Sequence, residues 1–240
     1  MRVLALTYQS DAGPGVFAEA VRARGGEIDE WLIPDGAEPP SDPYGYDAVM
    51  TFGGSMNTDE EGGYPWIRSQ RELIAGLVDA GRPLLGACLG AQLLVEAIGG
   101  QVLRMPGYEI GWFDTEVLPE AADDPLIGPM APGFESFNWH RYECLLPAGV
   151  ATLARSEHCV HAFRIREAVW GIQFHAEVTP ANANSWIDEW KEDEDSVTFG
   201  PDPELLRAET SDKIAAWNEV GRSLCTRFLD AVAASRALPS

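Results

Sequence analysis

The chain has 240 residues, 45% of them hydrophobic, which suits a globular α/β protein with a substantial core. Its formal net charge of −21 repels phosphate backbones and argues against a nucleic-acid partner. No apolar run approaches the ~18 residues of a membrane span, and residues 1–8 lack the features of a signal peptide, so we expect a cytoplasmic protein with no membrane partner.

The first hundred residues alternate between strand and helix patterns. Apolar and β-branched runs predict strands at residues 3–8, 28–33, 48–52 and 83–87. Periodic apolar residues predict helices at residues 15–24, 66–80 and 89–98, and glycine follows the last two. This alternation predicts a flavodoxin-like, doubly wound sheet that is mostly parallel.

The pattern changes after the first hundred residues. Residues 101–175 predict short strands and turns, and helical patterns return at 181–190 and 203–236. No repeat or linker divides the chain, so we expect a single domain over residues 1–240 with a C-terminal helical extension from about residue 181. The acid-rich stretch 188–195 is interpreted as a solvated loop, with docking of a basic partner as the alternative. Three tryptophans of the extension are expected to pack rather than to function: Trp186, Trp190 and Trp217.

Cys88 lies between the fourth predicted strand and the helix that follows it. Gly86 and Gly90 flank it two residues away on either side, which is the nucleophile-elbow pattern with cysteine in place of serine. Glycine lets strand and helix approach closely at such a turn, and the helix N-terminus favours a thiolate. A buried structural cysteine is the alternative, but glycine makes up only 24 of the 240 residues, so this flanking is rare by chance. We therefore predict a catalytic cysteine.

A general base for Cys88 must come from only four histidines. His175 ends an apolar and aromatic run, residues 168–175, that predicts a buried strand, and sites assemble at the C-terminal ends of strands in open α/β sheets. Glu177 follows two residues later and can hold one ring nitrogen while the other faces the cysteine. A core histidine beside a surface glutamate is the alternative. Next to a cysteine elbow, however, the pattern favours a Cys88, His175 and Glu177 triad.

Two other kinds of site lack their residues. No Gly-x-x-x-x-Gly-Lys-Ser/Thr phosphate loop occurs in the chain. Residues 158–161 read His-Cys-Val-His, but this set is incomplete for zinc, and successive strand residues face opposite sides of a sheet. We therefore expect no cofactor and no metal site.

Six segments between residues 45 and 180 resemble the class I glutamine amidotransferase family. The resemblance is to its small stand-alone branch, similar to the amidotransferase domain of GMP synthase. The cysteine and histidine segments carry most of the specificity. In chain order, the segments are Thr-Phe-Gly-Gly-Ser-Met-Asn (51–57), Tyr-Pro-Trp (64–66), Gly-Ala-Cys-Leu-Gly-Ala-Gln (86–92), Glu-Ile-Gly-Trp (109–112), Trp-His (139–140) and Gly-Ile-Gln-Phe-His-Ala-Glu (171–177).

The resemblance implies a role for each of these segments. Cys88, His175 and Glu177 would cleave the γ-amide of glutamine, and the backbone N–H groups of Gly54 and Leu89 would form the oxyanion hole. Gln92 would help to seat the substrate, and the segment from residue 139 to 142 would meet its amino-acid end. The implied substrate-binding residues are thus Gln92, Trp139, His140, Arg141 and Tyr142.

Three residues differ from those usual in the family. Ser55 and Ala176 stand where proline is usual, and His161 stands where glutamine is frequent. Ser55 leaves the oxyanion loop less rigid, because proline would fix φ. None of the three differences removes a catalytic group.

Three functions stay open at this point. The first is hydrolysis of the glutamine side-chain amide to glutamate and ammonia, with the ammonia passed to a separate synthetase subunit. The second is a partner-independent hydrolase of other γ-glutamyl amides or peptides. The third is a regulatory binding protein that has kept the fold and lost turnover.

Overall fold

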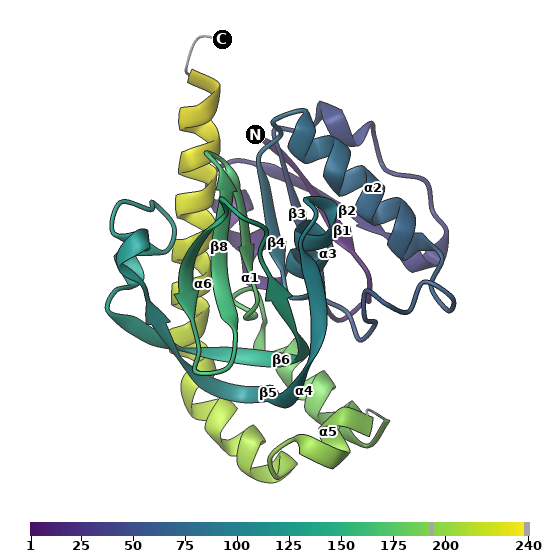
Figure 1. The fold of residues 1–240 in the computed structure, drawn as a ribbon, viewed down its shortest axis with the longest axis vertical. Coiled ribbons are helices and arrows are strands. Elements are labelled where there is room, and N and C mark those ends of the chain that lie inside the picture. Colours follow the sequence, from purple (N-terminus) through teal and green to yellow (C-terminus); the bar gives the residue numbers. More distant parts are fainter. Residues whose placement is uncertain (193, 238–240) are drawn as a thin grey trace.

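The computed structural model describes residues 1–192 and 194–237 (Figure 1). A nine-stranded mixed sheet lies at its centre. The strands are β1 (Arg2–Thr7), β2 (Glu27–Leu32), β3 (Ala48–Thr51), β4 (Leu84–Ala87), β5 (Gln101–Val117), β6 (Gly133–Leu145), β7 (Ala151–Arg155), β8 (Val160–Arg166) and β9 (Val169–Ile172). The α-helices are α1 (Gly15–Ala23), α2 (Trp66–Asp79), α3 (Leu89–Ala97), α4 (Pro180–Asp188), α5 (Glu194–Phe199) and α6 (Pro203–Ala237).

The strand order is β2-β1-β3-β4-β9-β8-β7-β5-β6. Strands β2, β1, β3, β4 and β9 run parallel to one another. Strands β8, β7, β5 and β6 continue the sheet with antiparallel pairing. The predicted doubly wound α/β architecture, parallel in its core, is confirmed.

Helices cover both faces of the parallel half of the sheet. Alternate residues of β1 point to opposite faces, so Val3 and Ala5 belong to one apolar cluster and Leu4 and Leu6 to another. The first cluster includes side chains of α1 and α6, and the second includes side chains of α2 and α3. Every residue of β3, β4 and β9 is buried, as is typical of parallel strands between two helical layers.

The elements predicted over the first hundred residues match the structure to within one residue at each end. In the C-terminal extension, α6 also matches, and the predicted helix at 181–190 is α4 followed by the 3-10 helix η5 (Glu189–Glu192). Figure 1 shows α6 running along one side of the molecule, with α4 and α5 near β5 and β6. Within the described ranges, no helix is both long and apolar enough to cross a bilayer.

The prediction of only short strands between residues 101 and 175 was wrong. β5 has 17 residues and β6 has 13, and they pair along most of their length. Pro106 and Gly107 resemble a turn in the sequence, but the structure places them in a register shift between Arg104 and Glu109. Such an irregularity accommodates a proline without ending the strand. The strand predicted at 168–175 is shorter than expected, because β9 ends at Ile172.

Candidate active site

Cys88 forms a sharp turn between β4 and α3. It is the only non-glycine residue of the described chain with positive φ, at φ 50° and ψ −115°. Such a backbone conformation is strained for a residue with a side chain, and it is the geometry of a nucleophile elbow. Cys88 is the N-cap of α3 and is only 5% exposed. The sequence prediction of an elbow at this position therefore agrees with the backbone geometry.

Gly90 and Gly86 allow the close approach that this turn requires. A Cβ atom on Gly90 would lie 2.2 Å from the carbonyl oxygen of Thr51, and one on Gly86 would lie 2.9 Å from the backbone nitrogen of Ala91. The Gly90 N–H also donates to Phe52 O at 2.9 Å, so the first turn of α3 is joined to the end of β3. No side chain fits in these gaps without moving backbone.

His175 approaches Cys88 from the segment that follows the neighbouring strand, β9. β4 and β9 are parallel partners with Ala87 opposite Ile172, so the segments that follow them leave the same edge of the sheet. His175 lies three residues beyond the end of β9, and its Nδ1 is 2.7 Å from Glu177 Oε1. With Nδ1 held by the carboxylate, Nε2 is the ring nitrogen available to the thiol.

The environment of His175 favours its charged form. Burial lowers the pKa of the imidazole, but the charges of Cys88 and Glu177 and hydrogen bonds to both outweigh burial and raise the pKa to about 10. Gly53 makes room for the ring, because a Cβ atom there would lie 2.8 Å from His175 Cε1. The Trp186 ring packs edge-on against the imidazole, with 4.8 Å between ring centroids.

A cavity of about 180 Å³ opens beside Cys88. All but one of the site residues predicted from the sequence line it; Glu177 is the exception and lies behind His175. The predicted residues that line the cavity are Gly54, Cys88, Leu89, Gln92, Trp139, His140, Arg141, Tyr142 and His175. The structure therefore brings segments from four parts of the sequence to one cavity.

The implied substrate-binding residues have distinct contacts around this cavity. Cys88 Sγ lies 3.9 Å from the carbonyl oxygen of Trp139 on β6. The Arg141 guanidinium stacks on the Phe199 ring, 3.6 Å from its centroid. Gln92 Nε2 lies 3.3 Å from Gln173 Oε1. These contacts orient the wall of the cavity formed by β6 and α3.

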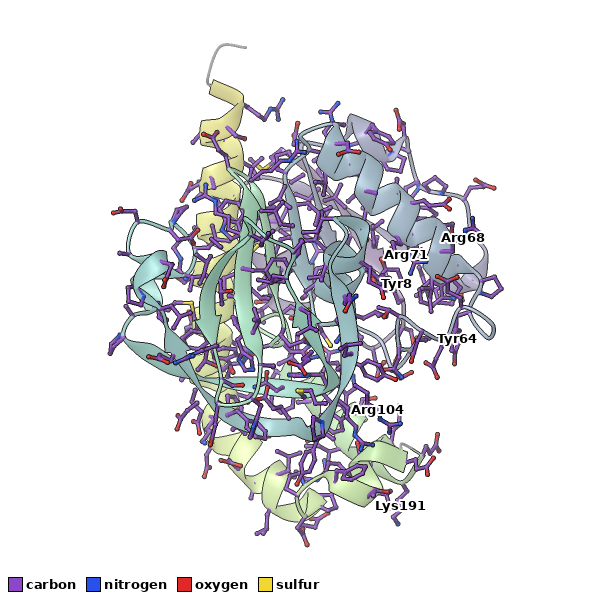
Figure 2. The ribbon with its side chains drawn as sticks, in the orientation of Figure 1. Tyr8, Tyr64, Arg68, Arg71, Arg104 and Lys191 are labelled. Carbon is purple, nitrogen blue, oxygen red and sulfur yellow. The ribbon has the colours of Figure 1, made fainter. Side chains whose placement is uncertain are left out.

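The loop after β3 forms another wall and is tied to two helices. Arg71 on α2 is labelled in Figure 2. It pairs with Glu61 of the loop and, at 2.7 Å, with Glu96 on α3. Thr58 of the loop also donates to Glu96, at 3.0 Å. The loop is therefore anchored beyond Gly54 through Thr58 and Glu61. Directly after Gly54, Ser55 N donates to Gln9 Oε1 at 2.9 Å.

Sequence reasoning missed two cavity residues from the C-terminal extension. Trp186 on α4 and Glu189 at the start of η5 both line the cavity. Trp186 packs against the core cluster, as expected, but its indole N–H is buried with no hydrogen-bond partner among the described residues. Trp190 and Trp217 do pack in the core, as expected. The signal for Trp186 was its place on a helix that begins three residues after Glu177.

A second group of titratable side chains lies next to the cavity. Glu109 on β5 is fully buried, 2.6 Å from His161 Nε2 and 3.0 Å from His140 Nε2. Burial raises the pKa of Glu109, but the adjacent rings of His140 and His161 outweigh burial and hold the pKa well below its usual range. Cys159 Sγ lies 3.7 Å from the same carboxylate. These four groups have the types and spacing of metal ligands, which the His-Cys-Val-His segment alone did not indicate.

Comparisons of sequence place the chain among known proteins. A model of the family described as "Glutamine amidotransferase class-I" matches residues 18–190. The glutamine amidotransferase-like protein YfeJ of Salmonella typhimurium is 30% identical over 183 residues, which cover 75% of this chain and 77% of YfeJ. A glutamine-hydrolyzing GMP synthase subunit of Halobacterium salinarum is 32% identical over 149 residues, 61% of this chain and 74% of that subunit.

Another relative and a solved structure are also similar to this chain. The gamma-glutamyl-L-1-hydroxyisopropylamide hydrolase of a Pseudomonas species is 29% identical over 143 residues, which cover 56% of this chain. The chain spans only 48% of that hydrolase. The crystal structure of a glutamine amidotransferase from Thermotoga maritima superposes with a TM-score of 0.85 at 27% identity, covering 96% of this chain and 98% of that one.

Gly90→Ala should destabilise the protein, because the new methyl group would overlap the Thr51 carbonyl. Overpacking of this kind costs about 1–3 kcal/mol. Urea unfolding measures the loss. The matched control is Gly62→Ala, since a Cβ atom at Gly62 meets nothing within 4 Å. Equal stability of the two variants would contradict the close packing at the elbow.

The imidazole of His175 should titrate near pH 10, because Cys88 and Glu177 stabilise its charged form. Its contribution to the free energy of unfolding is then complete below about pH 6.5 and is lost as pH rises toward 10. NMR titration of the histidine ring carbons measures the pKa directly. In Cys88→Ala the pKa should fall, since one negative partner is gone. A wild-type His175 that titrates near pH 6 would rule out the ion pair.

Proposed function

The chain belongs to the class I glutamine amidotransferase family, and on that premise we propose that it hydrolyses the side-chain amide of glutamine. Cys88 is the nucleophile, His175 the general acid and base, and Glu177 the group that orients His175. One observation carries the proposal: an elbow cysteine shares a cavity with a histidine whose Nδ1 is 2.7 Å from a buried carboxylate. The products are glutamate and ammonia.

The first half of the reaction forms a thioester. The Cys88 thiolate attacks the γ-carboxamide carbon, and the carbonyl π electrons move onto oxygen. Leu89 is the first residue of α3, so its N–H has no partner within the helix and is available to the oxyanion. Gly54 N–H is the second donor, and losing one such donor slows acyl transfer by about 10²–10³. His175 then gives its proton to the amide nitrogen, the C–N bond breaks, and ammonia leaves.

The second half releases glutamate. His175, now neutral, takes a proton from water as the water oxygen attacks the thioester carbon. The tetrahedral intermediate collapses, the C–S bond breaks, and the Cys88 thiolate and protonated His175 are restored. Glu177 stays ionised throughout and stabilises the imidazolium. The protonated His175 stabilises the departing Cys88 thiolate and so assists C–S cleavage.

The rest of the cavity seats the amino-acid end of the substrate. Gln92 and the backbone of β6 from Trp139 to Tyr142 lie on one side of Cys88. Tyr142 OH donates to Asp59 at 3.2 Å, which links this strand to the loop that carries Gly54. Substrate binding on β6 and placement of the oxyanion donor are therefore mechanically connected.

A separate synthetase subunit is the proposed recipient of the ammonia. The similarity to a subunit of a glutamine-hydrolyzing GMP synthase supports this assignment. The loop is anchored on either side of Gly54, but the Gly53–Gly54 peptide carries no side chain and Ser55 adds no proline restraint, so this one peptide can turn. A partner that presses on this loop would turn the Gly54 N–H toward the substrate, so that ammonia forms only when an acceptor is ready.

Hydrolysis of other γ-glutamyl amides is the second candidate function. Trp186 and Glu189 extend the cavity with an indole and a carboxylate. These groups suit a leaving nitrogen whose substituent carries a positively charged amine. The similarity to a γ-glutamyl amide hydrolase favours it as well. A regulatory protein without turnover is the third candidate, and the contacts of Cys88, His175 and Glu177 argue against it.

A glutamine-analogue diazoketone should alkylate Cys88 and none of the other cysteines. Cys144, Cys159 and Cys225 do not line the cavity as Cys88 does, and burial raises the pKa of each of these three thiols, to about 12 for Cys225. Peptide mass spectrometry identifies the alkylated residue, and Cys88→Ala serves as the control that should lose both labelling and turnover. Labelling spread over the four cysteines would argue against an activated thiolate at the elbow.

The purified chain alone should hydrolyse glutamine about 10²–10³-fold more slowly than the partner-activated enzyme, because one oxyanion donor is not fixed. Ammonia or amine release from glutamine and from a panel of γ-glutamyl amides measures this. A fast glutamine rate that no added protein changes would contradict partner gating. A fast rate only with substituted amides would establish the second function, and Trp186→Phe should then change kcat/KM for those amides more than for glutamine.

A further inference from the structure

We propose that Glu109, His140, Cys159 and His161 form a buried site for one divalent transition-metal ion, with Zn²⁺ as the best match. The candidate ligand atoms of these side chains all lie within 4.8 Å of one another. None of the four residues is more than 8% exposed. This inference does not depend on the proposed hydrolysis, because only His140 among the four residues also lines the catalytic cavity.

The four residues come from two parts of the sheet, the β5–β6 pair and the start of β8. Glu109 and His140 are direct register partners on β5 and β6. Cys159 immediately precedes β8 and His161 is its second residue, and both side chains approach Glu109, Cys159 Sγ at 3.7 Å and His161 Nε2 at 2.6 Å. β7 separates β8 from β5 in the strand order. An ion bound by all four residues would therefore join two separate parts of the sheet.

The hydrogen bond of His140 indicates that this set of side chains needs a cation. His140 Nδ1 lies 3.0 Å from the carbonyl oxygen of Tyr142, which can only accept, so Nδ1 carries the proton. A neutral His140 then presents a lone pair at Nε2, 3.0 Å from Glu109 Oε2, which is also an acceptor. Among the described residues, neither His140 Nε2 nor Glu109 Oε1 has a hydrogen-bond partner. Two buried acceptors that face each other need a positive charge between them.

His161 is held in the orientation of a metal ligand. Its Nδ1 lies 2.8 Å from the Thr115 hydroxyl, which in turn lies 2.9 Å from Ser136 Oγ. When Nδ1–H donates to Thr115, Nε2 is free to coordinate, and it already points at Glu109 at 2.6 Å. Ligand histidines almost always donate their other ring N–H to such a partner. Both histidines here have one.

The charges of this set balance a dication. Glu109 supplies one negative charge, and Cys159 supplies a second when the metal displaces its thiol proton to solvent. The two neutral imidazoles add none, so the buried site with a divalent ion is neutral. A single proton between Glu109 and His140 would neutralise the carboxylate but would leave the thiol of Cys159 without a role. Imidazole, thiolate and carboxylate are all ligand types that bind Zn²⁺, and four of them suit its tetrahedral preference.

Four protein ligands would fill a tetrahedral coordination sphere, which is typical of a structural site. The ion would fix β6 at His140, within the segment proposed to bind the substrate's amino-acid end. It would thereby join β5, β6 and β8 behind the catalytic cavity. Removing it should lower stability and weaken substrate binding without removing a reacting group.

Metal analysis and Co²⁺ binding test the site on untagged protein. After removal of metal with a chelator, Zn²⁺ or Co²⁺ should bind at one ion per chain and raise Tm by about 5 °C or more. Co²⁺ should give visible bands of a tetrahedral site together with a sulfur-to-cobalt charge-transfer band in the near ultraviolet. Purified protein with less than about 0.1 ion per chain that also fails to bind added Co²⁺ would overturn the proposal and leave a proton as the shared cation.

Two variants and one control localise the binding. His161→Gln should lose at least about tenfold in Co²⁺ affinity, as mutation of a ligand or its support does. The control, His158→Gln, changes an exposed histidine three residues away and should bind as the wild type does. Cys159→Ser should lose the charge-transfer band, and this spectrum decides the matter if His161→Gln does not fold. Equal loss in both histidine variants, or a charge-transfer band that survives Cys159→Ser, would refute these ligands.

Discussion

The strained turn at Cys88 is the constraint around which the rest of the site is arranged. A residue with a side chain at φ 50° persists only where its surroundings determine its backbone, and here β3, β4 and the first turn of α3 do so. Cys88 N donates to Ile172 O at 2.9 Å, so the end of β9 also holds the turn. That bond fixes the nucleophile to the strand from which its proposed base emerges.

The C-terminal extension supports the segment that carries His175 and Glu177. Trp217 on α6 donates to the His175 carbonyl at 2.8 Å, and Asn218 donates to Val178 O at 2.7 Å. From the other side, Val16 on α1 donates to Glu177 O at 2.9 Å. Residues 175–178 lie outside regular structure, and these bonds supply the backbone partners that a strand would otherwise give. The extension therefore positions the proposed base as well as lining the cavity through Trp186.

Local patterns in the sequence were sufficient for the elbow and for the helices and strands of the parallel half, because glycine spacing and apolar periodicity act over a few residues. The length of β5 was not predictable in this way, since the register shift near Pro106 depends on pairing with β6. The buried cluster at Glu109 was also missed. His161 lies 52 residues from Glu109 in the chain, and only the antiparallel half of the sheet brings them to 2.6 Å.

The central claim, that the elbow cysteine forms a covalent γ-glutamyl intermediate, is tested most directly by acid quenching and mass spectrometry. The chain is mixed with glutamine or with an activated γ-glutamyl ester, quenched during turnover, and digested. We predict a γ-glutamyl thioester on the peptide that contains Cys88 and on no other cysteine peptide. Turnover without any adduct on Cys88, or an adduct on Cys144, Cys159 or Cys225 instead, would contradict the claim.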